Sequence, residues 1–120
     1  MEFKKSTAQL SRVGETLSGF LNTGGGRVLI GVTPSGRAVG QQVSDTTLQD
    51  IASMIARIEP AMQVSLERVP VPGQPGCEVI ILSAQGLAEQ GPFLEHFRFN
   101  LSQDLRDHAE TQRRRENPCY

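Results

Sequence analysis

The sequence predicts an α+β domain in which two helices pack on one face of a mixed, mostly antiparallel sheet. Apolar residues recur at helical spacing in two segments, about 6–22 and 44–58. Apolar runs of strand length follow each of them, at 28–32 and 77–83. A chain of 120 residues is long enough for one hydrophobic core and too short for two.

The first helix is expected over residues 6–22. Its apolar positions are Leu10, Val13, Leu17, Phe20 and Leu21. Ser6-Thr7 offers a capping hydroxyl at the start, and Asn22-Thr23-Gly24 offers the left-handed residue that often ends a helix. Gly14 and Gly19 each weaken the helix by about 1 kcal/mol relative to alanine. We expect these small residues to permit close packing against the sheet.

A β-hairpin is expected directly after this helix. The run from Val28 to Val32 forms its first strand, and Thr33-Pro34-Ser35-Gly36 has the composition of a turn. Arg37 to Val39 then returns as a short partner strand.

The second helix is expected to begin near Ser44 to Thr46 and to end before Pro60. Thr46 and Gln49 have the spacing of a capping box. The apolar positions of this helix are Leu48, Ile51, Ala52, Ile55 and Ile58.

Two more strands are expected before residue 84. Val64 to Val69 alternates like a half-buried strand, and a loop rich in proline and glycine follows it over residues 70–76. Cys77 to Ser83 forms the next strand. Its unbroken apolar run, Val79 to Leu82, predicts a place in the middle of the sheet.

The pattern weakens beyond Ala84. Phe93, Phe97 and Phe99 suggest one more strand. We predict one domain over residues 1–102 and a polar tail over residues 103–120, frayed or helical, because the tail has few apolar residues.

Bulk composition limits the classes of function. The net charge is −1, whereas nucleic-acid binders usually carry a basic excess. No apolar run approaches the roughly 18 residues of a membrane span, and no secretory signal is expected at the start. Two cysteines, Cys77 and Cys119, indicate a reducing cytoplasm without a disulfide framework, and they form no zinc site with the two histidines.

An ordered series of short segments runs along the first two-thirds of the chain. The series comprises Glu2-Phe3-Lys4-Lys5-Ser6, Phe20-Leu21-Asn22-Thr23-Gly24-Gly25, Leu29-Ile30-Gly31-Val32 and Val39-Gly40. It resembles the Schlafen AlbA-type domain, which in bacteria is usually described as a DNA-binding or transcriptional-regulator module. The residues that carry this resemblance are Glu2, Asn22, Gly24, Gly25, Gly31 and Gly40.

The resemblance also brings nuclease activity into consideration, since some members of the family bind a divalent metal through two glutamates and a later aspartate. Glu2 matches the second glutamate, and the first would lie before Met1. Thr33-Pro34 stands where the aspartate is expected. One carboxylate of three cannot hold a catalytic metal. We therefore expect no enzymatic activity, no metal and no cofactor.

Local positive charge supplies the binding hypothesis. Lys4, Lys5, Arg12 and Arg27 can form one basic edge if the first residues run beside the first strand. A solvated helix start explains the same residues equally well. Arg98 is the one position retained from the arginine-carrying strand late in the family pattern, and the expected Arg-x-Gly after it is absent. The glycine-rich turn has the wrong element order for a nucleotide-binding loop, which favours a structural role.

The sequence thus predicts a cytoplasmic nucleic-acid-binding module, with DNA favoured over RNA and a homodimer plausible because small sheets have open edge strands. Two alternatives remain. One is a protein-interaction or dimerisation module without a nucleic-acid role, and the other is a divalent-metal RNase built across a dimer.

Overall fold

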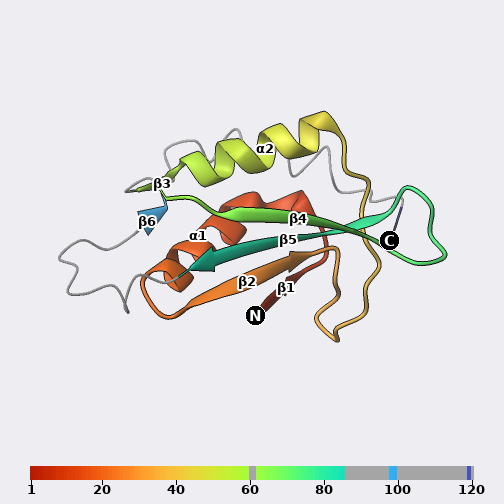
Figure 1. The fold of residues 1–120 in the computed structure, drawn as a ribbon, viewed down its shortest axis with the longest axis horizontal. Coiled ribbons are helices and arrows are strands. Elements are labelled where there is room, and N and C mark those ends of the chain that lie inside the picture. Colours follow the sequence, from red (N-terminus) through yellow and green to blue (C-terminus); the bar gives the residue numbers. More distant parts are fainter. Residues whose placement is uncertain (60–61, 86–97, 100–118, 120) are drawn as a thin grey trace.

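The computed structural model describes residues 1–59, 62–85, 98–99 and 119, which form two helices packed on a four-stranded sheet, with a small second sheet beside them (Figure 1). In chain order the elements are β1 (Glu2–Lys4), the 3-10 helix η1 (Thr7–Gln9), α1 (Leu10–Leu21), β2 (Gly25–Ile30), α2 (Asp45–Ala56), β3 (Ile58–Glu59), β4 (Ser65–Pro70), β5 (Glu78–Gln85) and β6 (Arg98–Phe99).

The larger sheet has the strand order β1-β2-β5-β4. β1 runs parallel to β2, and the other two pairings are antiparallel. This arrangement confirms the predicted mixed, mostly antiparallel α+β fold. It also confirms that the apolar run of β5 lies in the middle of the sheet. β3 and β6 pair separately, with Ile58 opposite Phe99.

The two faces of the larger sheet have different partners. Successive residues of a strand point to opposite faces. One face contributes Val28, Ile30, Ile80 and Leu82 to the main core, together with the buried positions of both helices. The opposite face carries a smaller apolar cluster around Val32, Val71 and Val79, against which Phe3, Leu29 and Ile81 pack half-buried. We call this second side the open face, because the helices lie on the other side.

The first helix begins and ends differently from the prediction. The Ala8 N–H donates to Ser6 Oγ at 3.2 Å, so Ser6 does act as a cap, but it caps η1 and α1 begins only at Leu10. Asn22 keeps a right-handed conformation with φ −84°, which makes the predicted left-handed stop wrong. The positive φ of 91° belongs to Gly25, where β2 begins three residues earlier than expected.

The predicted hairpin after β2 is reduced to an isolated bridge between Val32 and Ala38. The turn between them is confirmed, since the Gly36 N–H donates to the Thr33 carbonyl at 2.9 Å and Gly36 has a φ of 92°. After the turn, the chain does not continue as a strand. It crosses the backbone at Gly31, where Gly40 makes a close contact that is described below.

The second helix begins where predicted, but its cap is Ser44, two residues before the predicted Thr46. Ser44 has extended backbone angles and accepts the Thr47 N–H at 3.2 Å, while Thr47 Oγ1 accepts the Ser44 N–H at 3.2 Å. The predicted pair of Thr46 and Gln49 is therefore wrong. The buried face also differs, because Met54 is in the core whereas Ala52 is exposed.

β4 is exposed at all six residues, which corrects the predicted half-buried strand. The reason is its place at the edge of the sheet. α1 packs on β2 and β5, and α2 packs on α1, so β4 lies beyond the part of the sheet that α1 covers. An alternating sequence gives a buried side only where another layer lies over it.

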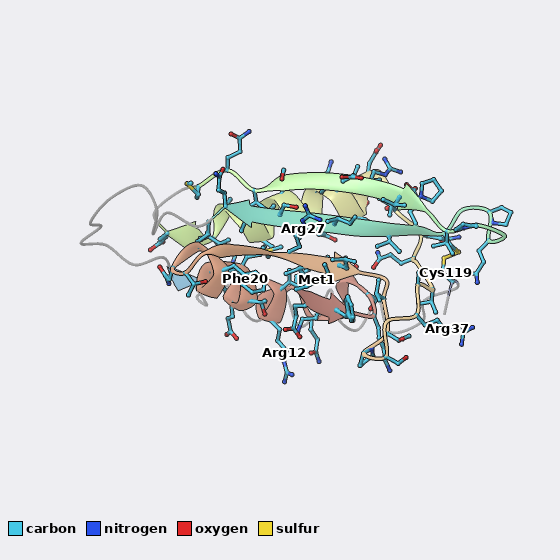
Figure 2. The ribbon with its side chains drawn as sticks, turned by 60° about the horizontal axis from the view of Figure 1, so that its bottom comes forward. Met1, Arg12, Phe20, Arg27, Arg37 and Cys119 are labelled. Atoms are coloured by element: carbon cyan, nitrogen blue, oxygen red, sulfur yellow. A yellow bond between two sulfur atoms is a disulfide. The ribbon has the colours of Figure 1, made fainter. Side chains whose placement is uncertain are left out.

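Cys77 and Cys119 form a disulfide with their Cα atoms 5.8 Å apart, so the prediction of two reduced cysteines is wrong (Figure 2). The bond fixes Cys119 at the loop between β4 and β5. The cytoplasmic location stays a prediction, and this disulfide counts against it because such bonds are rare in a reducing compartment. Phe93 and Phe97 of the expected last strand, and the predicted tail over residues 103–120 apart from Cys119, lie outside the described residues.

Candidate nucleic-acid interface

Three of the predicted basic residues lie along one short piece of chain. Lys4 ends β1 beside Ile30, Lys5 follows it exposed, and the turn of η1 then leads into α1. Arg12 points outward from α1, on the side opposite its buried residues (Figure 2). We call Lys4, Lys5 and Arg12 the β1–α1 edge.

Arg27 does not belong to this edge. It precedes Val28 in β2, and Val28 faces the helices, so the exposed Arg27 side chain lies on the open face. Arg98 lies in β6 opposite Glu59, apart from the larger sheet. The structure thus distributes the five predicted binding residues over three places, and only the β1–α1 edge holds more than one of them.

Two carboxylates accompany the β1–α1 edge. Glu2 is exposed and shares the side of β1 on which Lys4 lies, because the two residues are two positions apart in a strand. Glu15 is exposed about one helical turn after Arg12. The local excess of positive charge is therefore modest, and any attraction to phosphates is weak and sensitive to salt.

The surroundings of Glu2 give no support to a metal centre within the described residues, since no three His, Cys, Asp or Glu side chains there are grouped to hold an ion. Thr33, at the position expected for an aspartate, instead uses its hydroxyl to accept the Arg37 N–H at 3.1 Å. The hydroxyl stabilises the turn before Val39.

Gly31 and Gly40 of the family pattern meet where two chain segments cross. Both have positive φ values, 100° and 75°. The Gly31 carbonyl accepts the N–H groups of Val39 and Gly40 at 2.9 and 2.8 Å. A Cβ on Gly31 would lie 2.9 Å from the Gly40 Cα. These glycines therefore serve a close backbone crossing, and their role is structural.

The glycine-rich turn is also structural. Asn22 and Gly24 are exposed, and Gly26 leaves room for the ring of Phe20, whose atoms would lie 2.7 Å from a Cβ at that position. The turn follows the C-terminus of α1, where the helix dipole is negative and disfavours an anion. This arrangement supports the interpretation of a turn over that of a phosphate loop.

The sequence analysis missed a buried polar link at the start of the fold. Gln41 is only 4% exposed and Thr7 only 1%. Gln41 Oε1 accepts the Thr7 N–H at 2.8 Å, and its Nε2 lies 3.3 Å from Thr7 Oγ1. The backbone of Gln41 also pairs with Glu78 at the start of β5. The link fixes the segment that follows Lys5 against the sheet.

Arg57 is a second missed residue. It caps the end of α2, is buried, and places its guanidinium carbon 4.4 Å from the ring centroid of Phe99. Such a contact is a cation–π interaction. A charged residue at a helix end is usually exposed, so no local signal in the sequence pointed to this burial.

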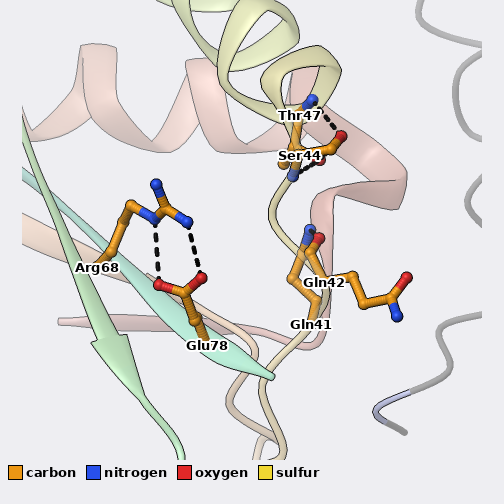
Figure 3. Close-up of polar contacts among 6 residues, drawn as sticks. All are labelled: Gln41, Gln42, Ser44, Thr47, Arg68 and Glu78. Atoms are coloured by element: carbon orange, nitrogen blue, oxygen red, sulfur yellow. Dashed lines mark hydrogen bonds and ion pairs between the residues drawn. The ribbon is translucent and has the colours of Figure 1, made fainter. Parts of the chain in front are cut away.

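One ion pair lies at the edge of the sheet, away from the candidate interface. Arg68 Nε and one terminal nitrogen donate to the two carboxylate oxygens of Glu78 at 3.1 and 2.8 Å (Figure 3). The hydrogen bond and charge of Glu78 raise the pKa of Arg68. Arginine is already protonated at every physiological pH, so this pair gives no pH switch.

Comparison with known proteins bears on the same residues. A family model described as Schlafen, AlbA_2 matches residues 1–104, which include the β1–α1 edge and the crossing glycines. No curated protein matches the chain. Within the described ranges, neither helix has the length and apolar character to cross a membrane.

Proposed function

Because the chain belongs to the Schlafen AlbA_2 family, we propose that it binds nucleic acid, DNA more readily than RNA, through the β1–α1 edge. Family membership over residues 1–104 is the observation that carries the proposal, since this family is commonly associated with DNA binding. The position of Lys4, Lys5 and Arg12 adds a place for phosphate contacts. A role in transcription regulation is part of the same proposal.

Binding at this edge is expected to be electrostatic and to depend little on sequence. Lysine and arginine side chains that contact phosphates fix the position of a protein on nucleic acid without reading bases. Each neutralised phosphate of duplex DNA contributes about 0.9 to the slope of log Kd against log salt. Three contacts therefore predict a slope of about 2.7 for each protein molecule.

We also propose that the protein binds without cleaving. Among the described residues, no three His, Cys, Asp or Glu side chains are grouped to hold a metal ion, and hard divalent ions need several oxygen ligands. Incubation of tRNA and duplex DNA with the protein and Mg²⁺ or Mn²⁺ should leave both intact. Cleavage that is lost in Glu2→Gln would support the RNase alternative instead.

Fluorescence anisotropy with labelled duplex DNA, single-stranded DNA and tRNA over a salt series tests the binding proposal. Lys4→Ala/Lys5→Ala should weaken binding and lower the salt slope by about 1.8. Arg37→Ala is the matched control, because Arg37 is an exposed cation on the turn after Val32 and lies outside the edge. Equal losses in the two variants, or no binding at low salt, would overturn the proposal.

A further inference from the structure

Exposed apolar side chains gather on the open face. Met1, Leu66 and Val69 are the exposed large hydrophobic residues of the described chain. Val69 pairs with Val79, which belongs to the open-face cluster. Met1 continues the alternation of β1 on the side of Phe3, next to Arg27 (Figure 2). Two of the three thus share the face on which Leu29 and Ile81 are half-buried.

The same face carries one charge of each sign. Arg27 lies on β2 and Glu67 on β4, on either side of β5, and both are exposed. Arg27 pairs with Ser83 and Glu67 with Ile81. The two charges are therefore two residues apart along the direction of β5, on the same face of the sheet. Within the described part of the chain, neither charge has an ion-pair partner.

A two-fold axis can be drawn on an ideal sheet so that it exchanges the positions of Arg27 and Glu67. Strands lie about 4.8 Å apart and residues rise about 3.4 Å along each strand, which places the Cα atoms of Arg27 and Glu67 about 12 Å apart. A two-fold axis parallel to the sheet, crossing β5 between Ile81 and Ser83, exchanges them. On this idealised grid it also sets Ile81 over Leu29 of a second copy, and Val69 over Met1.

We propose that the open face is the contact surface of a homodimer, in which two sheets stack face to face. Each Arg27 then meets a Glu67 of the second copy, and each apolar residue meets an apolar residue. A symmetric dimer requires such a self-complementary patch. Nucleic acid fits this face less well, because Glu67 repels phosphates and offsets the charge of Arg27.

The patch is small, which determines how strong the dimer is. Phe3, Val71 and Val79 pack near one end of the face, where the turn at Gly36 approaches the ring of Phe3. Counted with these residues, the whole face from Met1 to Val69 measures roughly 14 by 14 Å. Standard interfaces bury about 800 Å² on each partner, so this smaller contact belongs to the weak, transient class.

Sedimentation velocity without nucleic acid, on the intact protein from about 5 to 300 µM, tests the proposal at concentrations where a weak contact associates. Val69→Asp should weaken dimerisation at least about tenfold, because it places a charge in an apolar contact. Leu66→Asp is the matched control: Leu66 is 38% exposed and Val69 37%, both are on β4, and Leu66 faces the other side. Its effect should stay below about twofold.

A charge reversal separates specific pairing from general stickiness. Arg27→Glu alone should weaken the dimer at least about tenfold, and adding Glu67→Arg should restore the Kd to within about threefold of the original. Circular dichroism melts establish that each variant is folded. A monomer at every concentration, equal effects of Val69→Asp and Leu66→Asp, or no rescue by the double reversal would each overturn the proposal.

The dimer proposal and the nucleic-acid proposal can be overturned independently of each other. Arg12→Ala should leave the dimer Kd unchanged, since Arg12 points outward from α1, which packs on the other side of the sheet. If the protein is monomeric and Val69→Asp instead weakens nucleic-acid binding, the face serves nucleic acid and the dimer proposal is overturned.

Discussion

The ring of Phe99 lies directly beside Gly14, in the space that any larger side chain at Gly14 would occupy. Through this contact the short strand β6 rests on α1, far from it in sequence. The guanidinium of Arg57 lies over the same ring. A glycine that weakens the helix locally therefore makes room for the ring at the place where β6 joins the core.

Gly14→Ala should lower the free energy of unfolding by about 1–3 kcal/mol, because overpacking against Phe99 outweighs the gain of about 1 kcal/mol in helix propensity. Gly19→Ala is the control, since nothing lies within 4 Å of a Cβ at Gly19. It should raise the free energy by up to about 1 kcal/mol. Urea denaturation measures both.

A double-mutant cycle shows whether the ring is responsible. In a Phe99→Ala background, Gly14→Ala should cost nothing or stabilise the helix, because the clash is gone. An undiminished loss in that background would show that Gly14 is needed for another reason.

Gln41→Met should lower the free energy of unfolding by about 1–3 kcal/mol, because a methionine of similar size leaves the buried Thr7 N–H without its acceptor. Gln42→Met, at the exposed neighbouring position, should change it by less than about 0.5 kcal/mol. Thermal or urea unfolding gives both values. Similar small effects at the two positions would argue against a structural role for the Gln41–Thr7 link.

Reduction of the disulfide should lower the free energy of unfolding by about 2–4 kcal/mol, because the unfolded chain gains freedom over a separation of 42 residues. Cys119→Ser should have the same effect without reductant. The double variant with Cys77→Ser should add only the packing loss at half-buried Cys77. If reductant moves the urea midpoint of Cys119→Ser as far as that of the unmodified protein, the bond is not the cause.

Local patterns predicted those parts of the fold that local forces determine. The amphipathic stripe from Leu10 to Leu21 and the solid apolar run of β5 each identify their burial from neighbouring residues alone. Errors arose where two local solutions were nearly equal. Ser44 and Thr46 both offer a capping hydroxyl, and only the path of the chain into α2 selects Ser44.

Contacts between distant segments were beyond local prediction. The burial of Gln41 depends on Thr7, 34 residues away, and the exposure of β4 depends on where α1 lies. The candidate site shows a different limit. Strand alternation alone would have separated Arg27 from Lys4, because Arg27 precedes the buried Val28. Grouping residues by charge ignored the face on which each lies.

The bond between Cys77 and Cys119 turns part of the chain into a closed loop that contains both β5 and β6. A single backbone cut inside this loop, by a protease for example, opens the loop and leaves one covalently joined molecule. A single cut before Cys77 separates the chain into two pieces held only by the packing of the sheet and the helices. The same break thus has opposite consequences on the two sides of Cys77, and non-reducing gels distinguish them.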